Sequence, residues 1–127
     1  MKFKITGRMH YYSKWAVAYV DQQIAEYYRA LVPKAFYIQP QRYPAHVTVV
    51  RFGMENPVHK EEFWNKYQDE QIEIEYENIV ETDGLYFWLS AWSPRIAEIR
   101  SELGLEEQRD HFKSYHITVG NVKKHPV

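Results

Sequence analysis

The sequence predicts a single α+β domain made of two similar lobes related by a pseudo-twofold axis. One observation is the length, because a chain of 127 residues (1–127) normally forms one domain. Another is a repeated order of an apolar strand, a capping residue, a helix, a loop and a histidine-bearing strand. The capping residues Asp21 and Ser93 lie 72 positions apart, and the histidines, His46 and His116, lie 70 apart. We expect each lobe to turn its histidine strand toward a shared central groove.

The first repeat begins with a strand at 15–20, which is apolar enough to be central in a sheet. A weaker strand signal at 3–9 precedes it. Asp21 is a good helix N-cap, and the helix over 22–31 should end near Pro33. A loop then leads to a strand at 45–52, which Gly53 ends.

The segment between the repeats predicts a second helix and a strand with one wet face. Pro57 suits the first turn of a helix over 57–67, and Phe63, Trp64 and Tyr67 are its expected apolar anchors. The strict alternation of apolar and acidic residues over 72–77 is typical of a half-buried strand.

The second repeat begins with a strand that ends at Trp92, after a hairpin-type turn at 83–84. Ser93 and Pro94 predict a helix start, and that helix should run to Leu103. The final strand is expected at 115–122, and the tail after Lys124 should be unstructured.

Composition limits the environments and partners that suit the chain. The absence of cysteine rules out disulfides and thiolate metal sites and fits a reducing compartment. The start, 1–5, lacks the apolar run of a signal peptide, and no stretch reaches the length of a membrane span. We therefore expect a cytoplasmic protein that does not enter a membrane. Basic residues gather beside the two histidine segments, which suits one or two phosphates and not an extended duplex.

Both histidine strands contain the same short pattern, His-x-Thr between apolar residues. Residues i and i+2 of a strand point to the same face. His46 and Thr48 therefore share one face of their strand, as do His116 and Thr118. The intervening valine and isoleucine side chains should point into the core, which leaves two imidazole–hydroxyl pairs pointing out of it.

Two histidines suit the cleavage of a phosphodiester, which needs one proton removed from the nucleophile and one given to the leaving oxygen. We expect one of His46 and His116 to be the general base and the other the general acid; the sequence leaves the assignment open. Thr48 and Thr118 would donate hydrogen bonds to non-bridging oxygens. No H-E-x-x-H motif and no cysteine is present, so we predict neither a metal nor a cofactor.

Further residues are candidates for holding the substrate. Tyr43 lies in the loop before the first motif and is the preferred residue for stacking on a base. Arg51 is out of phase with His46 and would reach a phosphate only if its strand ends early. The whole predicted substrate-binding set is Tyr43, Arg42, Arg51, Tyr86, Trp88 and Lys123.

The paired segments 46–49 and 116–119 resemble the H-x-[ST]-x motifs of the two-histidine (2H) phosphoesterases. The resemblance covers most of the chain, because the order of strands and helices also fits. It implies a bilobal fold in which antiparallel sheets line a cleft with helices outside. It also implies metal-independent chemistry at a 2′-linked or cyclic phosphate, in a small cyclic nucleotide or an RNA end. Some viral members degrade cyclic-nucleotide immune signals, and the short chain with aromatic-rich loops is similar to that group.

A non-catalytic module that binds RNA or nucleotides in the same cleft is the alternative. The histidines favour the enzyme, because binding alone would favour arginine and lysine at those positions.

Overall fold

The computed structural model describes residues 1–53, 55, 58, 60–107 and 114–122. Its strands are β1 (Lys2–Tyr11), β2 (Ala16–Tyr19), β3 (Ile38–Gln39), β4 (His46–Val50), β5 (Gln71–Thr82), β6 (Tyr86–Trp92) and β7 (Tyr115–Val122). Its α-helices are α1 (Gln22–Ala30) and α2 (Pro94–Glu102), and two short 3-10 turns lie at Lys34–Phe36 and Glu61–Phe63.

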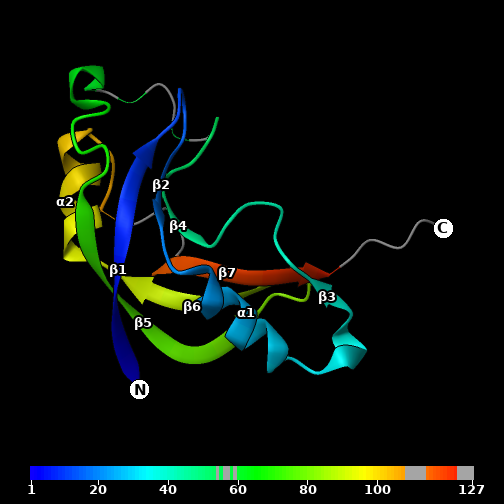
Figure 1. Cartoon of the computed structure of the whole chain (residues 1–127). Coiled ribbons are helices and arrows are strands. Elements are labelled where there is room, and N and C mark those ends of the chain that lie inside the picture. The colour runs from blue at the N-terminus through cyan, green and yellow to red at the C-terminus, as the bar shows by residue number, and fades with distance from the viewer. Residues whose placement is uncertain (54, 56–57, 59, 108–113, 123–127) are drawn as a thin grey trace.

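Six of the strands close into one antiparallel barrel (Figure 1). The order around it is β1, β2, β4, β7, β6, β5 and back to β1, and the short β3 adds to the far end of β7. Each half of the chain supplies three strands: β1, β2 and β4 from the first, and β5, β6 and β7 from the second. The repeated strand–helix–strand order is therefore present, as β2–α1–β4 and β6–α2–β7.

The predicted α+β fold of two lobes with sheets lining a central cleft is wrong, because the described residues form a mostly-sheet closed barrel with two α-helices. The halves join along two seams, β4 with β7 and β1 with β5. The second seam is long, with a continuous register from Lys2↔Glu77 to Arg8↔Gln71. The β1 strand, for which the sequence showed only a weak signal, thereby joins the two halves. A sheet that closes on itself has an interior filled by side chains and no cleft between lobes.

One apolar face of the barrel wall and both helices share one core. Val47, Leu89 and Ile117 are fully buried there, and Ala25 and Tyr28 of α1, Ile96 and Ile99 of α2 and the following Leu103 pack in the same cluster. The two helices begin at the predicted caps. The side chain of Asp21 accepts a hydrogen bond from the Gln23 amide (2.9 Å), and that of Ser93 accepts one from the Ile96 amide (3.2 Å).

The second predicted helix, 57–67, is also wrong. Among the described residues of this segment, the helical structure is limited to a 3-10 turn at Glu61–Phe63, and Trp64 already has an extended backbone. Asn65 then takes a positive φ of 69°, which a continuing helix does not permit. The extended conformation brings the indole of Trp64 to the β1–β2 turn, where its Nε1 donates to the carbonyl of Tyr12 (2.9 Å). Pro57 lies outside the described residues.

A buried ion pair fastens α2 to the end of β4. The guanidinium of Arg100 donates to both carboxylate oxygens of Glu55 (2.9 and 2.6 Å) and to the carbonyls of Val49 (2.6 Å) and Glu106 (2.7 Å). The Arg100 side chain is 1% exposed and that of Glu55 8%. Burial by itself would raise the pKa of Glu55, but the hydrogen bonds from Arg100 and the Arg51 amide outweigh burial and hold this pKa below its usual range.

Candidate functional site

The two His-x-Thr motifs lie side by side on one face of the barrel wall, opposite the apolar face that packs with the two α-helices. Val47 of β4 pairs with Ile117 of β7, and both are fully buried. In an antiparallel pair, one step forward on one strand matches one step back on the other. His46 is therefore opposite Thr118, and Thr48 is opposite His116. All four side chains point to the face away from the core and are partly exposed.

This register makes the two histidines diagonal neighbours on one face. Direct partners on one face of an antiparallel pair have Cβ atoms about 4.5–5.5 Å apart, and diagonal partners lie about 7–8 Å apart. The two imidazoles can therefore approach one phosphate from two sides, while each hydroxyl stands next to the histidine of the other strand. The expectation that both motifs face the same site is consistent with this geometry, although the site lies on a barrel seam and not in a cleft.

His46 is held by its own backbone turn and by aromatic rings. Its Nδ1 lies 2.7 Å from the carbonyl of Pro44, which can only accept, so Nδ1 carries a proton. In the neutral imidazole, Nε2 is then the basic nitrogen. The ring meets Trp15 edge to face (5.6 Å between centroids, 86°) and Tyr19 in the same manner (6.3 Å, 75°).

His116 has a different environment, on the β6 side of the seam. Its ring stacks on Trp88 with centroids 4.7 Å apart and planes 22° apart. Ser90 is its direct partner in register and donates to the carboxylate of Glu81. Hydrogen bonds from the Tyr86 and Leu85 amides lower the pKa of nearby Asp83, and attraction to His116 acts weakly in the same direction. Acidic groups therefore lie near His116.

A buried valine lies on the same face as the histidines. Val17 of β2 pairs with Thr48 and with His10 of β1, so it lies on the face of the histidines. It is fully buried, although it does not belong to the core cluster that includes both helices. Other side chains on the histidine face must therefore cover it. Trp15, which contacts both Tyr43 and His46, belongs to that cover.

The predicted substrate-binding residues are scattered around this face. Tyr43 is 51% exposed and packs against Trp15 (5.3 Å), and the Arg42 guanidinium carbon lies 5.8 Å from the Tyr43 ring. Tyr86 is exposed at the start of β6, and Trp88 lies against His116.

Arg51 and Lys123 are the remaining predicted cations. Arg51 follows the end of β4, and its Nε lies 3.5 Å from Glu55, toward the ion pair with Arg100. Lys123 lies outside the described residues.

Sequence reasoning missed several residues that surround the histidines. Tyr19 is the direct partner of His46 in register, and its hydroxyl is hydrogen-bonded to that of Tyr12. Burial and this hydrogen bond raise the pKa of Tyr19 to about 12, so the phenol stays protonated. Alternation along 15–19 would place Trp15, Val17 and Tyr19 on one face, but the apolar character of the segment was interpreted only as a sign of a central strand.

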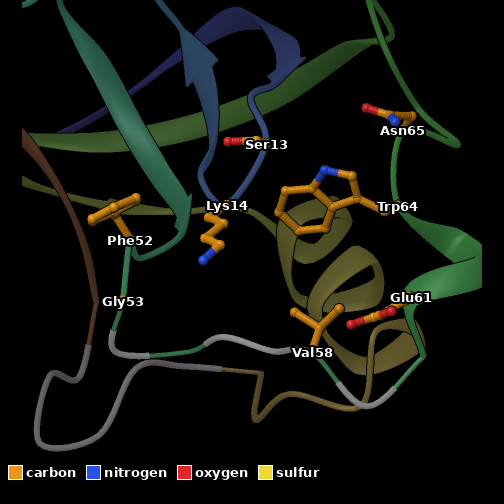
Figure 2. Close-up of a pocket in the computed structure, with 8 residues that line it drawn as sticks. All are labelled: Ser13, Lys14, Phe52, Gly53, Val58, Glu61, Trp64 and Asn65. Carbon is orange, nitrogen blue, oxygen red and sulfur yellow. The ribbon is translucent and has the colours of Figure 1, made fainter.

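A cavity of about 800 Å³ lies at the other end of β4 (Figure 2). The side chains of Lys14, Val58 and Trp64 point toward it, and the other lining residues are Ser13, Phe52, Gly53, Glu61 and Asn65. Neither His-x-Thr pair lines it, so this cavity is not the site that the motifs define.

Comparison of the chain with protein-family models, with curated proteins and with solved structures finds no match. Within the described residues, no group of three or more histidine, aspartate or glutamate side chains could hold a metal ion. No helix in that part of the chain has the length and apolar character that crossing a membrane would require.

Proposed function

We propose that the chain is a metal-independent phosphodiesterase of the two-histidine type. Its substrate is a cyclic nucleotide or oligonucleotide, or an RNA end with a 2′-linked or 2′,3′-cyclic phosphate. The observation that carries the proposal is the Val47↔Ile117 register, which brings two imidazoles and two hydroxyls to one face. The resemblance of the paired motifs to the 2H phosphoesterases supports the same chemistry. The lack of cysteine suits a reducing compartment, and we place the activity in the cytoplasm.

The surroundings of the two histidines favour one assignment of their roles. His46, with its Nδ1 proton directed at the Pro44 carbonyl, presents Nε2 as the base that takes a proton from water or from a neighbouring 2′-hydroxyl. The oxygen then attacks phosphorus, and protonated His116 gives its proton to the leaving oxygen as the P–O bond breaks. Thr48 and Thr118 donate hydrogen bonds to the non-bridging oxygens, where negative charge accumulates.

The experiment is a turnover assay with single and double histidine variants, in buffer with EDTA. Cyclic mono-, di- and trinucleotides and an RNA ending in a 2′,3′-cyclic phosphate are the substrates. We expect His46→Ala and His116→Ala each to lose about 10²- to 10⁴-fold in kcat/KM. His10→Ala is the matched control, because His10 lies on the same face but outside both motifs, and it should keep most of the turnover.

Two results would contradict the mechanism. Full activity in either single motif variant removes that histidine from the reaction, and complete loss of turnover in EDTA shows that a metal ion is needed. Tight binding of a nucleotide without any product would instead identify a non-catalytic nucleotide-binding module.

A further inference from the structure

We propose that Tyr12, Trp15 and Tyr43, here called the aromatic platform, bind the nucleobase of the nucleotide whose phosphate lies between His46 and His116. The inference rests on the proposed function for the position of the phosphate. It adds a binding site on one side of that phosphate, and it makes the substrate a nucleotide and not a simple phosphodiester.

The platform is continuous with the catalytic pair. Trp15 stacks on Tyr12 with centroids 4.9 Å apart and planes 18° apart, and it packs against Tyr43 at 5.3 Å. The same indole touches the His46 ring edge to face. A base lying on these rings is therefore next to the imidazole that acts on its own phosphate.

The rings offer contact area that the fold leaves unburied. Tyr12 is 39% exposed and Tyr43 51% exposed, although both belong to a cluster of aromatic side chains. Every nucleobase has a flat apolar face that stacks on such rings. The Arg42 guanidinium near Tyr43 places a positive charge at the edge of the platform, which suits a nucleotide better than a neutral apolar ligand.

Hydrogen bonds within the protein hold the Tyr12 and Trp15 part of the platform in place. The Tyr12 amide donates to the Trp15 carbonyl across the β1–β2 turn (2.6 Å), and the Tyr12 carbonyl accepts from Nε1 of Trp64 (2.9 Å). The hydroxyl of Tyr12 is hydrogen-bonded to the hydroxyl of Tyr19. Stacking on a surface that is already ordered costs less conformational entropy than stacking on mobile side chains.

The other side of the phosphate offers a less suitable surface. Trp88 is stacked on His116, so the imidazole already covers one face of its indole. We therefore assign the base to the His46 side of the phosphate. On the other side, Trp88 supports His116.

The experiment compares the dissociation constants of adenosine 5′-monophosphate and ribose 5-phosphate, measured by calorimetry or by NMR titration. The two probes share the sugar and the phosphate and differ in the base. Both are phosphomonoesters, so binding is measured apart from phosphodiesterase turnover. The variants are Tyr12→Leu and Tyr43→Leu, singly and together, which keep apolar bulk but remove the ring. Tyr27→Leu is the control, because Tyr27 is an exposed tyrosine on α1, outside the platform.

We expect the nucleotide to bind at least tenfold more tightly than ribose 5-phosphate. The double variant should lose that preference, whereas Tyr43→Phe and Tyr27→Leu should keep it. Equal binding of the two probes, or no measurable binding of the nucleotide, overturns the inference. A preference that survives in the double variant overturns it too, because the base then lies elsewhere.

These outcomes separate the platform from the catalytic proposal. If turnover depends on His46 and His116 but the two probes bind equally, the enzyme is supported and this base site is excluded. If the base preference depends on the two tyrosines but turnover does not depend on the histidines, the protein has a nucleotide-binding surface without the proposed chemistry.

Discussion

Replacing Arg100 with methionine should lower the free energy of unfolding by about 3–5 kcal/mol at pH 7. Methionine fills much of the same space, but it leaves the Glu55 carboxylate buried without its partner and removes the donors to the Val49 and Glu106 carbonyls. Arg95→Met is the matched control on the same helix. Arg95 bonds Glu70 with both side chains about one-third exposed, and such a surface pair is worth about 0–1 kcal/mol.

The assay is urea denaturation of the wild type and both variants between pH 7 and pH 3. Because the pKa of Glu55 is lowered in the folded state, the pair stabilises the wild type fully above the unfolded pKa of about 4.3. That contribution disappears as the pH falls through the lowered pKa that Glu55 has in the folded state. In Arg100→Met, protonation of Glu55 relieves the unpaired charge, so the gap between variant and wild type should narrow toward pH 3. A loss below about 1 kcal/mol at pH 7, equal to that of Arg95→Met, would refute the reasoning.

The other predictions concern the seam strands and the reaction. Thr48→Val and Thr118→Val keep the shape of the side chain but remove the hydroxyl, so each should reduce kcat by about 10²- to 10³-fold with little change in melting temperature; an unchanged kcat would exclude that threonine. The profile of kcat/KM against pH should be bell-shaped, because the reaction needs one neutral and one protonated imidazole, and a profile that rises without a descending limb would contradict the pair. Gly120→Ala should lower the free energy of unfolding by about 1–3 kcal/mol in a denaturation assay, because its Cβ would lie 2.8 Å from the Gln39 carbonyl oxygen and push β3 from β7; unchanged stability would show that β3 moves freely.

Local signals in the sequence predicted most of the regular elements. The caps Asp21 and Ser93 marked the starts of both α-helices, and the apolar alternation marked the motif strands, all within a residue or two of their observed bounds. The false helix over 57–67 arose from aromatic residues at helical spacing. Those side chains instead pack on the barrel from a 3-10 turn and an extended segment, which spacing alone does not distinguish.

The closure of the barrel could not be predicted in the same way. It depends on the pairing of β1 with β5, residues about seventy positions apart, and on the pairing of β4 with β7. Strand propensity does not identify which strand pairs with the edge of another. The meeting of the two motifs at one site was expected from the repeated order of elements. The neighbours Tyr12, Trp15 and Tyr19 became visible only with the register of β1 and β2.

The seam between β4 and β7 also ties activity to the order of folding. Neither half of the chain contains both imidazoles, and the strands that carry them are separated by a loop closure of roughly seventy residues, a slow kind of contact to form. The protein would therefore become active only when β7 pairs with β4. A collapsed chain in which these two strands are not yet paired would have no activity. Recovery of turnover after dilution from denaturant would time that docking event directly.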